Sequence, residues 1–209
     1  RIKQLVTGVD PTKYKYDDFT ILCRKRKSFD EIEDAFTLLN IPYTIVGGKG
    51  FYQQQVIYDI YNYLNFLINV KNDAALVGVL RSPFFTISDA EIFEISLEEG
   101  ENYWDKFINY SKSKNRLTQV LKILNENIEL AWNIDIPILV KKIIEDTGYL
   151  AVIAAGPRGK HEIASIEKLV RISNSFFNQG LKSLYDFVKF LEDATSNRVD
   201  EGEPGISLL

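Results

Sequence analysis

Residues 19–59 read FTILCRKRKSFDEIEDAFTLLNIPYTIVGGKGFYQQQVIYD, and the order of patterns in this stretch decides the fold. Residues 19–23 are a short apolar run of β-formers that ends in a basic cluster, which predicts a buried strand with charge at its carboxyl end. Ser28 and Glu31 have the spacing of a capping box, and apolar residues then recur at helical spacing as far as Leu39. These patterns predict a strand followed by a helix.

A second β-rich run and a glycine turn follow the predicted helix. Pro42 marks the end of that helix, and residues 43–46 favour a second strand. The glycines of residues 47–50 permit a backbone turn that residues with a Cβ would resist, and a helix that begins near Gln53 carries Asp59. A β-α-β unit is therefore expected, and open sheets of this kind place their ligand sites at the carboxyl ends of the strands.

This ordered combination resembles the second RecA-like lobe of superfamily 1 DNA helicases of the UvrD, Rep and PcrA type. Two later segments are most similar to the AddA (RexA) helicase-nuclease branch, namely LRSPFF at residues 80–85 and DTGYL at residues 146–150. The resemblance covers nearly the whole chain. It implies an ATP-dependent DNA helicase, of the exodeoxyribonuclease V type, that acts in DNA recombination and repair and moves 3′ to 5′ along single-stranded DNA.

Composition limits the classes of protein that fit. With 209 residues, 45% hydrophobic and 26% charged, the chain is long enough for one large or two small domains with a real core. The net charge of −4 argues against a dedicated basic nucleic-acid module, so any DNA contact must be local. The lone Cys23 excludes an internal disulfide framework, and the lone His161 leaves no ligand set for zinc. No apolar run approaches a membrane span, and the cytoplasm is the expected compartment.

The expected fold is mainly α with a small α/β part. Residues 1–88 would form the first part of an incomplete RecA-like lobe of the P-loop NTPase type, residues 89–202 an all-helical insert, and residues 203–209 a truncated return strand. The chain has no methionine and closes on a β-like run, so it is expected to be a fragment of a longer protein. Helical patterns are predicted at residues 1–6, 52–70, 74–80, 90–98, 102–112, 117–131, 138–147, 161–179 and 184–194, with Asn72 and Ser88 as caps.

The resemblance assigns Arg24 the contact with the γ-phosphate of ATP. A guanidinium suits this role because it offers a permanent charge and two parallel donors to a transferring phosphoryl group. A charge that follows a strand is, on the other hand, usually solvated.

DNA contacts are expected from Gly47, Gly48, Tyr52, Arg81 and Ser82. By resemblance the glycine turn lies beside the single-stranded DNA path, with an aromatic residue to brace it, and the other two residues hold the DNA backbone. Alternatives remain for each. The glycines lack the spacing of a phosphate-binding loop and also suit a plain turn, and Arg81 would equally complement the helix dipole.

The resemblance also implies cofactors and partners. ATP and Mg²⁺ would be bound by the intact enzyme and neither by the fragment alone, which is expected to be inactive and to bind no other metal. The expected partners are single-stranded and duplex DNA, the first RecA-like lobe and a nuclease subunit. Two other interpretations remain open, a non-enzymatic helical docking domain and a repair helicase without a nuclease. Trp104 and Trp132 are interpreted as packing residues.

Overall fold

The computed structural model describes residues 2–8, 13–23, 31–32, 35–36, 38–43, 51–180 and 183–196. Within these ranges the chain is largely helical and contains no β-strand. Two short 3₁₀ turns are η1 Tyr16–Asp18 and η2 Phe51–Gln53. The α-helices are α1 Ile2–Thr7, α3 Gln55–Ile68, α4 Asp73–Arg81, α5 Asp89–Ser96, α6 Tyr103–Ser111, α7 Asn115–Leu130, α8 Ile136–Asp146, α9 Tyr149–Ala154, α10 Gly159–Asn178 and α11 Leu184–Ser196.

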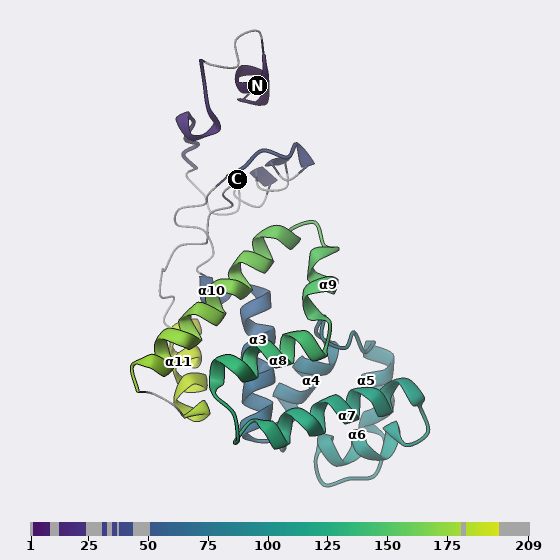
Figure 1. Cartoon of the computed structure of the whole chain (residues 1–209). Helices are drawn as coiled ribbons and strands as arrows, with labels where there is room; N and C mark the ends of the chain where they lie inside the picture. Colours follow the sequence, from purple (N-terminus) through teal and green to yellow (C-terminus); the bar gives the residue numbers. More distant parts are fainter. Residues whose placement is uncertain are drawn as a thin grey trace.

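Helix α3 lies at the centre of the helical body, where α4, α10 and α11 pack against it (Figure 1). Val56, Ile60 and Leu64 mark its apolar face at helical spacing, as predicted. Ile57 and Phe66 lie on opposite flanks of that face, and both are buried as well. Because α3 is apolar around most of its circumference, neighbouring helices must cover it on several sides.

Local capping residues set where the next helices begin. The Asn72 side chain accepts a hydrogen bond from the Ala75 N–H at 3.1 Å and starts α4. Ser88 and Glu91 form the capping box that the sequence predicts at the start of α5. The Asn102 side chain accepts a hydrogen bond from the Asp105 N–H at 3.0 Å and starts α6. The predicted helices after residue 52 are therefore confirmed to within a few residues at their ends.

The sequence pattern does not predict the short helix α9. Gly148 has a φ of 65°, in the left-handed region that glycine adopts without steric cost, and it forms the turn between α8 and α9. The six residues of α9 are too few to show a convincing helical period, so the sequence indicates only a turn between two glycines at this place.

The predicted buried strand at residues 19–23 is wrong for the part of the chain that is described. The segment forms no strand, and the side chains of Ile21 and Leu22 are 46% and 93% exposed. A β-former becomes a strand only when a neighbouring strand pairs with its backbone groups, and the described residues supply no such neighbour. Residues 44–46 and 203–209, expected to add further strands, lie outside the described ranges.

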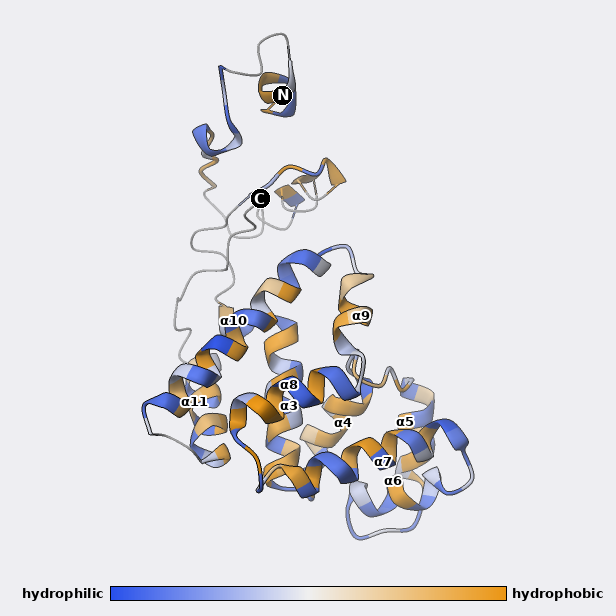
Figure 2. Cartoon of the chain, viewed as in Figure 1, coloured by the Kyte–Doolittle hydropathy of each residue, from blue (hydrophilic) through white to orange (hydrophobic). Residues whose placement is uncertain are grey.

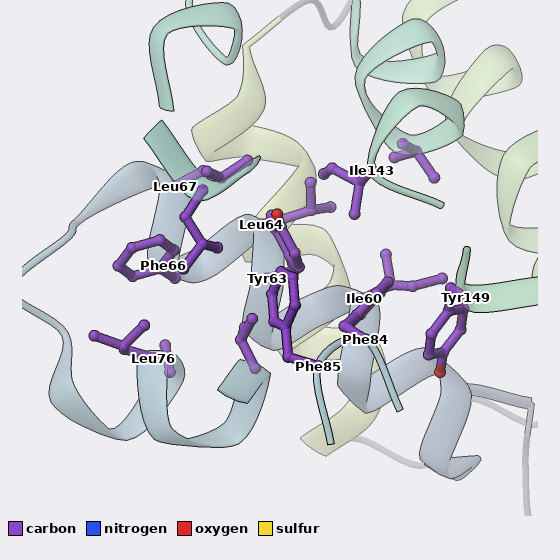
Figure 3. Close-up of a cluster of buried hydrophobic side chains, with 14 of the residues drawn as sticks. Ile60, Tyr63, Leu64, Phe66, Leu67, Leu76, Phe84, Phe85, Ile143 and Tyr149 are labelled. Carbon is purple, nitrogen blue, oxygen red and sulfur yellow. The ribbon is translucent and has the colours of Figure 1, made fainter. Parts of the chain in front are cut away.

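Helices α3 and α4 share a single buried cluster with the helices that follow them (Figure 3). The same helices carry both orange and blue residues in Figure 2, as amphipathic helices around a common core do. The division into residues 1–88, 89–202 and 203–209 stays a prediction.

Trp104 is buried as predicted, whereas the interpretation of Trp132 as a packing residue is wrong, since its side chain is 63% exposed in the turn between α7 and α8.

Tyr63 and Asn127 link α3 to α7 inside the core, and this link gives a first test of the fold. The Asn127 amide donates a hydrogen bond of 2.9 Å to the Tyr63 hydroxyl, and both side chains are fully buried. Tyr63→Phe leaves the buried amide without this acceptor, so the free energy of unfolding should fall by about 1–3 kcal/mol. Urea unfolding measures the change. Tyr185→Phe is the matched control, because Tyr185 is 57% exposed, and equal losses in both variants would contradict the assignment.

Candidate functional site

The segment LRSPFF ends α4 and continues into the tight turn of residues 82–88, called the 82–88 loop from here on. The Ser82 hydroxyl donates to the Val79 carbonyl at 2.7 Å and accepts from the backbone N–H two residues later at 3.3 Å. The Ile87 N–H donates to the Leu80 carbonyl at 2.9 Å. The loop therefore folds back on the last turn of α4.

Arg81, the last residue of α4, lies on the surface and pairs with Asp89, the first residue of α5. Its Nε lies 2.7 Å from one carboxylate oxygen and its Nη2 lies 3.2 Å from the other, so the pair has the two-pronged geometry of arginine with an oxyanion. The two side chains are 55% and 76% exposed. An exposed pair of this kind contributes only about 0–1 kcal/mol, so another anion can replace Asp89 at low cost.

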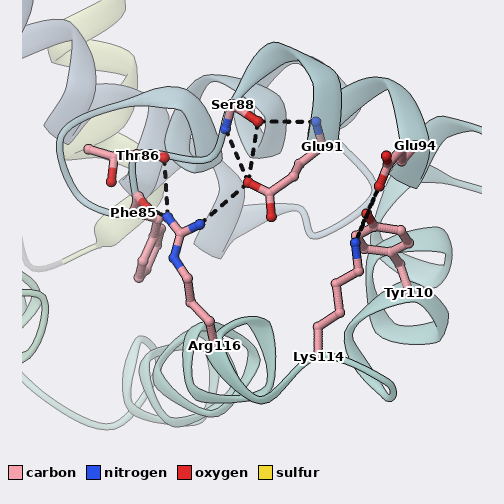
Figure 4. Close-up of polar contacts among 8 residues, drawn as sticks. All are labelled: Phe85, Thr86, Ser88, Glu91, Glu94, Tyr110, Lys114 and Arg116. Carbon is pink, nitrogen blue, oxygen red and sulfur yellow. Dashed lines mark hydrogen bonds and ion pairs between the residues drawn. The ribbon is translucent and has the colours of Figure 1, made fainter.

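Arg116 reaches the 82–88 loop from the start of α7 (Figure 4). Its Nη2 donates to the carbonyl oxygens of Phe85 and Thr86 at 2.8 and 3.2 Å, and its Nη1 lies 3.4 Å from a carboxylate oxygen of Glu91. Thr86 has a φ of 50°, a left-handed conformation that is rare for a β-branched residue. Arg116 therefore contacts the backbone at the strained position of the loop.

Lys114 makes a parallel contact two residues earlier. It binds Glu94 of α5 and the Tyr110 hydroxyl, and Tyr110 also binds Glu94 (Figure 4). The hydrogen bonds from Tyr110 and then from Lys114 lower the pKa of the Glu94 carboxyl. Basic residues at the start of a helix oppose its dipole, and the first turn of α7 has no acid. This unusual placement is the sequence signal that could have identified Arg116, which the sequence analysis missed.

A buried carboxylate lies behind the 82–88 loop. Asp59 accepts hydrogen bonds of 2.8 Å from the Tyr149 hydroxyl and from the Gln55 amide, one on each oxygen. The ring of Phe84 stacks on the ring of Tyr149 with centroids 4.0 Å apart (Figure 3). Asp59, the LRSPFF segment and the DTGYL segment, which carry much of the resemblance, thus meet at one place in the interior.

The surroundings shift the acidity of this pair in a consistent direction. Burial raises the pKa of Asp59, and the hydrogen bonds from Gln55 and Tyr149 offset part of that rise. Burial, followed by the neighbouring Asp59 carboxylate, raises the pKa of Tyr149 far above its ordinary value. Tyr149 therefore keeps its proton at neutral pH and donates a hydrogen bond to Asp59. Glu162 of α10 lies close enough to add to the rise at Tyr149, and burial raises its own pKa as well.

Two of the predicted DNA-binding side chains are in the interior. Tyr52 has no exposed surface and packs edge-on against Phe51 and Phe190, with centroids 4.9 and 5.9 Å apart. Ser82 is 6% exposed, and its hydroxyl is occupied within the loop. In this arrangement neither side chain is exposed to a nucleic acid, and the DNA contacts predicted for both residues stay predictions. Arg81 is the predicted DNA-binding residue that the described structure places on the surface.

The predicted residues Arg24, Gly47 and Gly48 lie outside the described ranges, and their roles stay predictions. Within those ranges no three His, Cys, Asp or Glu side chains come together as a metal site. None of the described helices is both long enough and apolar enough to cross a membrane.

Comparison with known proteins places the chain in a family context. The family model described as "UvrD-like helicase C-terminal domain" matches residues 1–204. Proteins named as subunits of an ATP-dependent helicase/nuclease are similar to it, with 29% identity in Lactobacillus helveticus, 26% in Lactobacillus johnsonii and 24% in Leuconostoc mesenteroides. These alignments cover 91%, 92% and 94% of the chain and 16% of each relative, so the chain spans about one sixth of their length. The resemblance to the helicase-nuclease branch is confirmed.

The buried carboxyl of Asp59 predicts a specific pH dependence of stability. Because its pKa is raised in the folded state, the folded protein binds this proton more tightly than the unfolded chain does. Stability relative to Asp59→Asn should therefore fall as the pH rises from about 4 through the raised pKa. Urea unfolding at several pH values, compared between wild type and Asp59→Asn, measures this difference.

Two further variants sharpen the same test. Tyr149→Phe removes one donor to the charged carboxylate, so the fall should extend to higher pH and the loss at neutral pH should be about 1.5–3 kcal/mol. Glu162→Gln controls for the other acid nearby and should preserve the sign of the trend. A stability of wild type that rises with pH relative to Asp59→Asn would contradict the assignment.

Proposed function

The chain belongs to the UvrD-like helicase C-terminal domain family, and from this premise we propose that it is part of an ATP-dependent DNA helicase-nuclease. The intact enzyme would move 3′ to 5′ along single-stranded DNA and act in recombination and repair. The chain would contribute part of the second motor lobe, which grips DNA and senses ATP. Because the chain spans about one sixth of its relatives, these activities are proposed for a longer protein and not for the chain alone.

One observation carries this proposal, namely that the LRSPFF segment, the DTGYL segment and Asp59 meet in the interior next to the exposed Arg81. Phe84 stacks on Tyr149, and Tyr149 binds Asp59, so the 82–88 loop rests on a fixed interior support. At the edge of this support Arg81 stands on the surface in a geometry that suits an oxyanion. A DNA phosphate carries the oxygens that such a guanidinium binds, and phosphate contacts position a protein on DNA without reading its sequence.

The proposed ATP site is divided between this chain and residues elsewhere in the enzyme. Arg24 would reach the γ-phosphate, while the first RecA-like lobe would hold most of the ATP and its Mg²⁺. A guanidinium at this position would neutralise charge that develops during phosphoryl transfer. The proposal assigns the Mg²⁺ ligands to the first lobe, by resemblance to the family.

A docking role is the second candidate, and exposed apolar residues favour it. Phe93 and Leu97 lie four residues apart at α5 and are 63% and 70% exposed. Large apolar side chains at this spacing form a stripe suited to a protein partner, and the proposed nuclease subunit is one such partner. Docking alone makes no use of the oxyanion-binding geometry of Arg81, so we favour the role in the motor lobe.

The role of Arg24 is tested in the full-length enzyme by DNA-stimulated ATP hydrolysis. Arg24→Ala should lower turnover strongly, by about 10³-fold by analogy with other arginine residues that contact transferring phosphates. Circular dichroism and DNA affinity serve as controls and should not change. Unchanged turnover in a folded variant would show that Arg24 is a solvated surface charge, and an enzyme without any DNA-stimulated ATPase would favour the docking role.

The role of Arg81 is tested by DNA affinity in the same enzyme. Arg81→Ala should weaken binding of single-stranded DNA about tenfold and reduce the salt dependence by about one phosphate contact. Asp89→Asn should instead tighten binding by about two- to fivefold, because it removes the anion that competes for Arg81. Fluorescence anisotropy of a labelled oligonucleotide at several salt concentrations measures both.

Lys122→Ala is the matched control for this test. Lys122 pairs with Glu126 on the exposed face of α7, at 3.9 Å, and this pair lies within a single helix, apart from the 82–88 loop. Its loss should therefore leave the affinity within about twofold. If Arg81→Ala and Lys122→Ala weaken binding equally, or if Asp89→Asn has no effect, then Arg81 does not contact phosphate.

A further inference from the structure

Among the described residues, Arg116 is the one residue distant in sequence whose side chain donates hydrogen bonds to the backbone of the 82–88 loop. It comes from α7, about thirty positions away from the two carbonyls that it binds. A single guanidinium nitrogen donates to the carbonyl oxygens of Phe85 and Thr86, and the opposite nitrogen pairs with Glu91. The contact joins three elements, which are the loop, α5 and α7.

Thr86, whose carbonyl Arg116 binds, is also the residue with the strained backbone. Thr86 is β-branched, is exposed and has a φ of 50°, and such residues resist the left-handed region because of their Cβ substituents. No glycine is present in the 82–88 loop to adopt this conformation without cost. The hydrogen bond from Arg116 to the Thr86 carbonyl offsets the strain and retains the turn.

This turn sets the position of Asp89 relative to Arg81. The Thr86 N–H donates to the Ser82 carbonyl at 2.9 Å, so the strained residue closes the loop onto the residue next to Arg81. Glu91 accepts from Arg116 and also from the Ser88 backbone, where α5 begins. α5 starts with Asp89, the anion that pairs with Arg81, so the loop sets how the arginine and this competing anion lie relative to each other.

We propose that Arg116 is a positioning residue for the DNA grip, which retains the left-handed turn at Thr86 and thereby presents Arg81 to a DNA phosphate. This inference rests on the proposed function, and it assigns Arg116 no contact with DNA. Its effect passes through the loop, so it depends on the conformational cost at Thr86. A glycine at position 86 removes that cost and makes Arg116 dispensable.

The experiment measures DNA-stimulated ATPase of the full-length enzyme at increasing concentrations of single-stranded DNA. Arg116→Ala should raise the DNA concentration for half-maximal stimulation about tenfold and leave kcat at saturating DNA within about twofold. Thr86→Gly alone should stay within about twofold of wild type. The double variant should recover to within about threefold, because glycine adopts the left-handed turn without help.

Lys114→Ala is the matched control. Lys114 lies at the start of the same helix and binds an acid of the same α5, but its partners are Glu94 and Tyr110, outside the loop. Its loss should leave the DNA concentration for half-maximal stimulation within about twofold. A thermal unfolding scan of each variant tests whether the affected proteins are folded at the assay temperature.

Three outcomes would overturn the proposal. An unchanged half-maximal DNA concentration in Arg116→Ala, while Arg81→Ala is impaired, rejects the positioning role and leaves the proposed function intact. A loss in Arg116→Ala that Thr86→Gly does not recover, or that Lys114→Ala reproduces, assigns Arg116 to general stability. A wild-type enzyme that DNA does not stimulate rejects both the positioning role and the proposed function.

Discussion

The arrangement of the helices depends on one buried carboxylate and its two hydrogen-bond donors. A carboxyl group removed from water is costly unless donors replace the lost solvent. Gln55, on the same helix as Asp59, supplies one donor in any packing arrangement. The second donor, Tyr149, is available only when α9 lies beside α3. The carboxylate therefore selects one placement of α9, and the stacking of Phe84 on Tyr149 extends that selection to the 82–88 loop.

Neighbouring residues of a single motif serve different purposes in this fold. Arg81 and Ser82 are adjacent in the sequence, yet one side chain is on the surface and the other is buried in the turn. The reason is geometric, because neighbouring residues of a helix point in different directions and Ser82 already belongs to the turn after α4. Tyr52 shows the same separation, since its ring packs in the core directly after a turn that is expected to face DNA. The buried residues of the motif support the 82–88 loop, and Arg81 stays exposed.

Charge is distributed between α5 and α7 so that each helix compensates the other. Arg116 and Lys114 stand at the start of α7, where the helix dipole disfavours positive charge. Glu91 and Glu94 of α5 pair with them across the interface. These pairs are partly exposed, and each contributes little to stability alone. Their arrangement matters more for geometry, since the arginine of the set also binds two backbone carbonyls of the 82–88 loop.

The sequence by itself determined the helix starts, the amphipathic faces and the family. The caps Asn72 and Ser88 were predictable because a cap acts on residues only two or three positions away, so no tertiary information is needed. Only the tertiary structure decided which of the apolar and aromatic residues are buried and which are exposed. Helical spacing did not distinguish Trp104, which is buried, from Trp132, which is exposed, because the period of a helix does not say which face another helix covers. The predicted sheet failed within the described ranges for a related reason, since a strand requires a distant partner. The contact between Arg116 and the 82–88 loop likewise joins residues about thirty positions apart, and only the packing of α7 beside α5 brings them together.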